Sequence, residues 1–193
     1  MILGVMTFSK RGQKTAEDLF EKYKEISPLY YDGDMPREAW IRDKFSYHIP
    51  LLFVGATGIA VRLIAPFVED KLRDSAVIVM DQRGRHVIPL LSGHMGGANE
   101  VARNLADRVG AEVILTTATD VEDLFAVDVF ARRNGFCICD RAGIRRISQR
   151  LLEGEKIRLA IDPAITFFKE DLPEGLHLVE ASDGNVDLWI GCN

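Results

Sequence analysis

The chain has 193 residues and a mass of 21.6 kDa, a length typical of one domain or of one domain with a smaller second lobe. Hydrophobic residues make up 47% and charged residues 27%, which excludes intrinsic disorder as the main state. The net charge of −5 argues against nucleic acid as the main partner, because phosphate binding favours a basic face. No apolar run approaches the ~18 residues that a membrane-spanning helix needs.

The three cysteines are Cys137, Cys139 and Cys192, an odd number with no metal-binding spacing. Cys137 and Cys139 lie two residues apart, so on a strand they share one face. We interpret them as a buried pair of reduced thiols. Since the N-terminus lacks the pattern of a signal peptide, a cytoplasmic location is expected. The four histidines are scattered, and no metal site is predicted.

The first part of the chain alternates between strand and helix patterns. Apolar runs and 3.6-residue periodicity predict, in order, a strand at 2–8, a helix at 13–26, an extended piece at 27–31, a helix after Pro36 and a strand at 49–54. Two further runs, 76–81 and 85–90, flank Gln82-Arg83-Gly84 and predict a hairpin.

The remaining elements are shorter. The pattern predicts a helix at 97–109, a strand at 111–116, a helix at 122–133, a strand at 135–139, a helix at 143–152 and strands at 157–161, 176–180 and 186–190. Alternating strands and helices predict an α/β fold with a mainly parallel sheet flanked by helices. A slight change of composition near residue 134 suggests an N-terminal α/β domain over 1–134 and a smaller α/β region over 135–193.

The first unusual loop follows the predicted strand 49–54 and reads Gly55-Ala56-Thr57-Gly58, with Arg62 one turn later. Glycines let a ligand approach the backbone closely. We predict that Thr57 caps the next helix, whose first N–H groups attract anions. We also predict that the guanidinium of Arg62 binds a carboxylate in a bidentate manner. A tight turn with a solvated arginine is the alternative, and the loop alone favours that alternative.

The second loop reads SGHMGGAN over residues 92–99 and holds three glycines and His94. An ordinary turn needs fewer glycines, so we predict a concave nest of N–H groups that binds an anion. Histidine titrates near neutral pH, which suits a general base. The alternative is that His94 merely bonds to the neighbouring backbone. The three glycines around His94 favour its role as a general base.

The third loop reads TTATD over residues 116–120 and follows a predicted strand. Asp120 is interpreted as the carboxylate that orients His94. A reaction that develops an oxyanion needs a hydrogen-bond donor, which could be the hydroxyl of Thr117 or the N–H groups near Gly96 and Gly97. Thr119 or Asp120 could instead cap the next helix. All three loops follow strands, and ligands bind beyond the carboxyl ends of strands in open α/β sheets, so we expect the loops to converge.

This reasoning gives one candidate site. Its catalytic residues are His94, Asp120 and Thr117. Its binding residues are those of the three loops, together with a second cation at the rim: Gly55, Thr57, Gly58, Arg62, Lys71, Ser92, Gly93, Gly96, Gly97, Asn99, Thr116 and Thr119.

The motifs together resemble a known family. GATGIAVR, then AP and DK, then LSGHMGGAN and TTATD, with TFSKRG near the start, are similar to the CbiG family of anaerobic cobalamin biosynthesis, the cobalt-precorrin-5A hydrolases. The resemblance is close from about Ile49 to Asp128. The family has an N-terminal region, a middle segment and a C-terminal domain, and this chain looks like the first two parts.

The resemblance implies a hydrolysis late in corrin ring formation. A δ-lactone of cobalt-precorrin-5A is opened and a two-carbon unit leaves as acetaldehyde, giving cobalt-precorrin-5B. Cobalt arrives within the substrate, so no cofactor of the protein's own is expected. The flat macrocycle carries carboxylates, which suits an open cleft with anion-binding rims.

Three functional hypotheses remain open from the sequence. The first is the hydrolase, with His94 as base. The second is a non-catalytic corrinoid-binding subunit that needs a separate C-terminal-domain chain. The third, a nucleotide-dependent enzyme, ranks last because neither phosphate-binding glycine motif is present. A homodimer is also compatible with the sequence.

Overall fold

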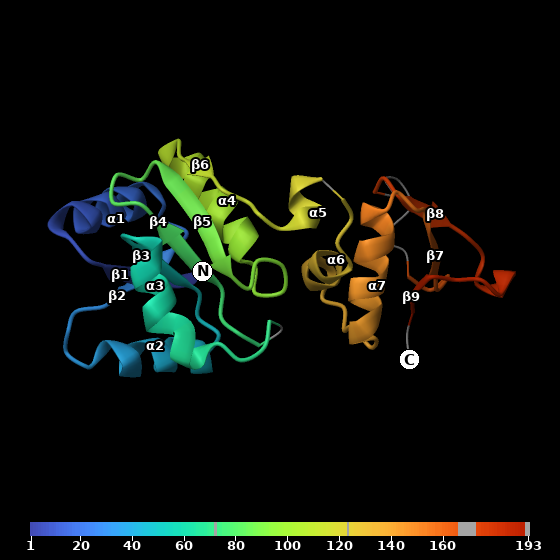
Figure 1. The fold of residues 1–193 in the computed structure, drawn as a ribbon, viewed down its shortest axis with the longest axis horizontal. Helices are drawn as coiled ribbons and strands as arrows, with labels where there is room; N and C mark the ends of the chain where they lie inside the picture. Colours follow the sequence, from blue (N-terminus) through green and yellow to red (C-terminus); the bar gives the residue numbers. More distant parts are fainter. Residues whose placement is uncertain (72, 123, 166–172, 192–193) are drawn as a thin grey trace. The chain divides into compact units, whose positions relative to one another are not determined.

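The computed structural model describes the whole chain except residues 72, 123, 166–172 and 192–193, so Cys192 lies outside the described residues. The chain divides into two compact units, Met1–Leu115 and Thr116–Asn193, shown from blue to red in Figure 1. Each unit has its own sheet, and each is described by itself.

Unit 1 is built on a six-stranded sheet in the order β2-β1-β3-β4-β5-β6. The strands are β1 (Ile2–Thr7), β2 (Ser27–Tyr30), β3 (Leu51–Val54), β4 (Val77–Met80), β5 (His86–Leu91) and β6 (Glu112–Val113). The first four are parallel to one another. β5 returns antiparallel to β4 as the predicted hairpin, and β6 runs parallel to β5.

Helices cover both faces of this sheet. The apolar side chains of α1 (Lys10–Lys22) and α4 (Ala98–Val109) belong to one core cluster, and those of α2 (Arg37–Ser46) and α3 (Thr57–Ile64), which continues into η1 (Ala65–Phe67), belong to the other. Successive residues of β3 alternate between the two clusters, and all four are buried. A strand buried on both faces needs an unbroken apolar run, which explains its sequence.

Unit 2 begins with α5 (Ala118–Val121), α6 (Val127–Asn134) and α7 (Arg141–Leu152). A parallel three-stranded sheet follows, in the order β8-β7-β9, from β7 (Ile157–Ile161), β8 (Leu176–Leu178) and β9 (Leu188–Ile190), with η2 (Ala181–Asp183) before β9. Its core contains Phe125, Val127, Ile147, Leu151 and Ile157. The α/β fold with a mainly parallel sheet and a smaller second lobe is therefore confirmed.

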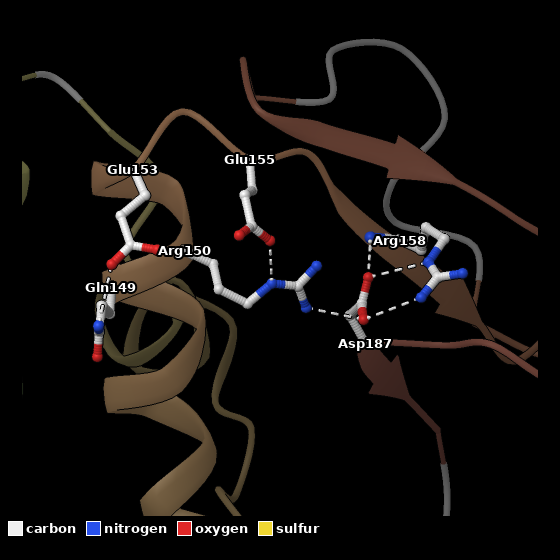
Figure 2. A network of polar contacts seen from close by, with 6 residues as sticks. All are labelled: Gln149, Arg150, Glu153, Glu155, Arg158 and Asp187. Carbon is white, nitrogen blue, oxygen red and sulfur yellow. Dashed lines mark hydrogen bonds and ion pairs between the residues drawn. The ribbon is translucent and has the colours of Figure 1, made fainter.

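A polar network joins α7 to the sheet of unit 2 (Figure 2). Asp187, just before β9, accepts hydrogen bonds from Arg150 Nη1 at 2.8 Å and from Arg158 Nε at 3.1 Å. The backbone N–H of Arg158 adds a bond of 2.9 Å to the same carboxylate. These bonds, chiefly those from Arg158, hold the pKa of Asp187 far below its usual range, although burial opposes the shift.

Several local expectations differ from the structure. Residues 135–139 form no strand, because Gly135 ends α6 in the left-handed region and the segment then runs along the surface. Cys137 and Cys139 are exposed, so the expected buried pair is wrong. The helix expected at 122–133 begins only at Val127, as α6, and the short helix α5 precedes the expected range.

The division between the units falls after Leu115, whereas the sequence placed a boundary near residue 134. The reason is packing. Phe125 and Val127 share a core cluster with Ile147 and Leu151 of α7, so the segment before residue 134 belongs to the same unit as α7. No helix in the described residues is both long and apolar enough to cross a membrane.

Candidate functional site

Residues 92–97, here the glycine loop, connect β5 to α4 and are fixed by their own backbone. Gly97 N donates to the carbonyl of His94 at 3.0 Å, and Ala98 N donates to the carbonyl of Ser92 at 3.1 Å. Asn99 N donates to the carbonyl of Gly93 at 3.0 Å. These N–H groups would otherwise face outward at the start of α4. The predicted open nest is therefore wrong at these three positions, and the loop is a closed turn.

Two glycines of the loop are required by close packing. A Cβ at Gly96 would lie 2.5 Å from Ser92 Cβ and 2.8 Å from the Ser92 carbonyl oxygen. A Cβ at Gly93 would lie 2.5 Å from the Asn99 side-chain oxygen. Real Cβ atoms do not come this close, so Ser92 and Asn99 are packed against bare backbone. The two glycines thus allow the loop that carries His94 to pack tightly.

Ser92 is the unusual residue of this loop. Its φ of 55° lies in the left-handed region, which costs a non-glycine residue about 1 kcal/mol or more. The residue is 9% exposed, and its buried hydroxyl has no hydrogen-bond partner among the described residues. Strained backbone and unpaired buried polar atoms are features that folds retain where a site needs them.

The loop after β3 has a different geometry from the predicted one. Ala56, not Thr57, occupies the cap position of α3, and no side chain caps that helix. Arg62 Nη1 donates to the carbonyl of Gly58 at 3.0 Å, so its guanidinium folds back on its own helix. A Cβ at Gly55 would lie 2.7 Å from the Phe8 ring. Gly55 therefore allows the Phe8 ring to pack closely against the backbone. The capping role predicted for Thr57 is wrong.

The two loops lie at opposite ends of the strands in the sheet of unit 1, and each end is here called an edge of the sheet. Val77, the first residue of β4, pairs with Leu51 at the start of β3 and with Leu91 at the end of β5. The glycine loop therefore follows β5 at the edge where the parallel strands begin, here the amino edge. Gly55 follows Val54, which pairs with Met80 at the carboxyl edge. The expected convergence of the first two loops is wrong, because the hairpin reverses the direction of β5.

Lys71 lies on the same side of the sheet as the glycine loop. It is exposed and belongs to the segment between η1 and β4, which enters the sheet at the amino edge. Asp74 shapes this segment by accepting the backbone N–H groups of Glu69 and Asp70 at 3.0 and 3.2 Å.

A cavity of about 510 Å³ lies at this edge, lined from α2, η1 and the segments before β3 and β4. Its polar lining includes Arg42, Arg73 and His48, together with Glu38, Glu69 and Asp74. Arg42 lies over the ring of Phe67, 5.8 Å from its centroid. The sequence reasoning passed over Arg42 and Arg73. The predicted hairpin was the available signal, because it brings the end of β5 to the edge where β3 and β4 begin.

The third loop opens unit 2. Thr117 precedes α5 without a side-chain capping bond, Thr119 is buried and Asp120 is half-buried in the first turn. Thr116 is exposed. Because β6 runs parallel to β5, the chain leaves unit 1 in the direction in which β5 ends. The roles of Asp120 in orienting His94 and of Thr117 in holding an oxyanion stay predictions.

Asp81 and the start of α1 lie outside the three motif loops. Asp81 forms the hairpin turn by accepting the N–H groups of Arg83, Arg85 and His86 at 2.7 to 2.8 Å. Burial acts to raise the pKa of Asp81, but these hydrogen bonds outweigh it and lower the pKa. Lys10 and Arg11, after β1, are exposed at the start of α1.

Two family models match this chain. The one described as "Cobalamin synthesis G N-terminal" matches residues 39–120, and the one described as "Cobalamin biosynthesis central region" matches residues 125–182. The cobalt-precorrin-5A hydrolase of Salmonella typhimurium is 43% identical over 147 residues, which cover 76% of this chain and 41% of that protein. The hydrolase of Priestia megaterium is 38% identical over 168 residues, 79% and 45% of the two chains.

The chain thus spans less than half the length of these relatives. The crystal structure of a cobalamin biosynthesis protein G homologue from Sulfolobus solfataricus aligns with 98% of this chain and 58% of that chain, at a TM-score of 0.58 and 22% identity, and supports the fold. The N-terminal match includes all three motif loops, and the central match falls within unit 2. The chain therefore belongs to the CbiG family, of which it carries the N-terminal and central regions.

Proposed function

We propose that this chain acts in cobalamin biosynthesis as a hydrolase that opens the δ-lactone of cobalt-precorrin-5A and releases acetaldehyde to give cobalt-precorrin-5B. The observation that carries the proposal is its 43% identity, over 147 residues, with a cobalt-precorrin-5A hydrolase. The proposal places the lactone-opening step in the part of the relatives that this chain shares.

His94 is the proposed base. The bonds that close the glycine loop fix the backbone on either side of it, which supports a defined position for its imidazole. The imidazole would take a proton from water as the water oxygen attacks the lactone carbonyl. The C–O bond of the lactone then breaks, leaving a carboxylate and a hydroxyl on the two-carbon unit. That hydroxyl loses its proton as the carbon–carbon bond to the macrocycle breaks, so the two-carbon unit departs as acetaldehyde and the macrocycle takes up the electron pair and a proton.

An oxyanion forms on the lactone carbonyl during this attack and needs hydrogen-bond donors. The N–H of Gly97 is committed to His94, whereas that of Gly96 has no partner among the described residues. Gly96 is therefore the better backbone donor. Thr117 is the proposed side-chain donor, since its hydroxyl does not cap α5. Asp120 is proposed to orient His94.

Cations at the amino edge suit the carboxylates of the macrocycle. Arg42, Arg73 and Lys71 lie on the segments that meet there, and arginine binds carboxylates in a bidentate manner. They replace Arg62 in this role, because the guanidinium of Arg62 folds back on its own helix and donates to the carbonyl of Gly58. The proposal keeps cobalt as part of the substrate, without a cofactor of the protein's own, and places the reaction in the cytoplasm.

The test is an acetaldehyde assay on the purified chain with cobalt-precorrin-5A. We expect acetaldehyde in proportion to the substrate consumed. If acetaldehyde appeared only after a separate C-terminal region of a relative was added, the chain would be the corrinoid-binding subunit instead. Binding of the substrate without any release under both conditions would contradict the hydrolase proposal.

A further inference from the structure

Unit 2 contains a groove, and none of its described lining residues belongs to the three motif loops. It has a volume of about 520 Å³ and runs between α6, α7, the segment 136–140 and the edge strand β9. Its apolar lining includes Phe130, Phe136, Ile144 and Trp189. Trp189 is 48% exposed, so its indole is available to a ligand in the groove.

Two thiols line the same groove. Cys137 and Cys139 both face it and both are exposed, so a ligand in the groove reaches sulfur directly. Thiolates are soft ligands for transition metals and bind them with loss of the thiol proton. Sulfur ligands beside aromatic walls suit a molecule that is flat and apolar and carries a transition metal at its centre.

The charged groups at the groove are already paired. Arg146 Nη2 lies 2.9 Å from Asp140 Oδ2, and Asp187 is held by Arg150 and Arg158 (Figure 2). Among the described residues that line it, the groove therefore offers no unpaired cation to a ring of carboxylates. It is suited to the apolar face of a macrocycle, whose carboxylates would remain in water or bind elsewhere.

We propose that this groove binds the face of a cobalt-containing tetrapyrrole and that Cys137 or Cys139 becomes an axial ligand of the cobalt. The inference rests on the proposed function, which supplies the cobalt macrocycle. The step is a ligand substitution at unchanged oxidation state. The bond from cobalt to an axial water breaks and the water leaves, a cobalt–sulfur bond forms, and the thiol proton passes to the solvent.

The probe is aquacyanocobinamide, a cobalt(III) corrinoid with one exchangeable axial water. All variants carry Cys192→Ser, so that only the two groove thiols remain. Visible absorption reports the axial ligand, and equilibrium dialysis reports the dissociation constant. We expect a thiolate-ligated spectrum in the parent, and in Cys137→Ser/Cys139→Ser its loss together with at least about tenfold weaker binding. The two single variants show which sulfur binds.

Ser182→Cys in the double variant is the matched control, because it restores one exposed thiol outside the groove. It should not restore the spectrum. Trp189→Ala should weaken binding while keeping the thiolate spectrum at saturation. An unchanged spectrum in the double variant, restoration by Ser182→Cys, or no binding by the parent would each overturn the inference.

The acetaldehyde assay separates this inference from the proposed function. Acetaldehyde release by a parent that shows no thiolate spectrum would refute the groove site and leave the hydrolase proposal standing. A thiolate spectrum that depends on the groove cysteines, in a chain that releases no acetaldehyde, would do the reverse.

Discussion

His94 is the residue on which the proposed chemistry depends most. If it is the base, His94→Ala should lower kcat by about 10²- to 10⁴-fold. The glycine loop is closed by backbone bonds, so the substitution should leave the fold intact. Steady-state acetaldehyde assays measure the rate, and circular dichroism with urea unfolding checks the fold. Full activity in His94→Ala would remove His94 from the mechanism without affecting the family assignment.

A substitution of Ser92 can distinguish a structural role of its hydroxyl from a functional one. Its buried hydroxyl has no partner among the described residues, so Ser92→Ala deletes no hydrogen bond that the fold uses. We expect the free energy of unfolding to change by less than about 0.5 kcal/mol, whereas a paired buried hydroxyl would cost about 1 kcal/mol or more. If the hydroxyl serves the substrate, kcat/KM falls in the same variant. A large loss of stability in urea unfolding would show that the hydroxyl is structural.

At the scale of an element, the glycine loop and α3 offer a matched pair of glycine substitutions. Gly96→Ala drives a Cβ into the Ser92 backbone, which cannot yield cheaply, and should cost about 1–3 kcal/mol. Gly58→Ala lies in a helix, and its Cβ would meet only the flexible end of Arg62 at 3.3 Å. It should stabilise the chain by about 0.5–1 kcal/mol. Urea unfolding of both variants tests the contrast, and equal effects would contradict the packing argument.

The network at Asp187 predicts a dependence of stability on pH. Asp187→Asn weakens the contacts of α7 and β7 with the segment before β9 and should cost unit 2 about 1–3 kcal/mol at pH 7. Because the folded-state pKa is lowered, this contribution is full above the ordinary aspartate pKa of ~3.9 and is lost as the pH falls through the folded-state pKa. The difference between wild type and variant in urea unfolding should therefore be smaller at pH 3 than at pH 7.

Periodicity predicted most elements, because buried runs such as β3 and amphipathic helices such as α4 carry strong local patterns. The hairpin was predicted from a local turn, and hydrogen bonds to Asp81 hold that turn in the structure. Its consequence is not local. Reversal of β5 moves the glycine loop to the amino edge, away from Gly55, and only the strand order shows this. The strand predicted at 135–139 is wrong, because the apolar residues of the segment 136–140 line a groove and do not belong to a sheet.

At the scale of the whole molecule, the boundary between the units is open to a direct test. The sequence placed it near residue 134, and the structure places it after Leu115 because Phe125 and Val127 complete the core around α7. A fragment of residues 116–193 should fold cooperatively, whereas 135–193 loses those two buried side chains. Removing one large apolar side chain from a core costs about 2–5 kcal/mol, a large fraction of the stability of a small domain.

Circular dichroism and urea unfolding of the two fragments measure this difference. We expect a cooperative transition for 116–193 and none for 135–193. The complementary fragment 1–115 keeps all six strands of its sheet and both of its core clusters, so it should also unfold cooperatively. A stable 135–193 would return the boundary to the position predicted from composition. It would also mean that the groove beside Cys137 and Cys139 forms without α6, whose Phe130 and Ala131 line it.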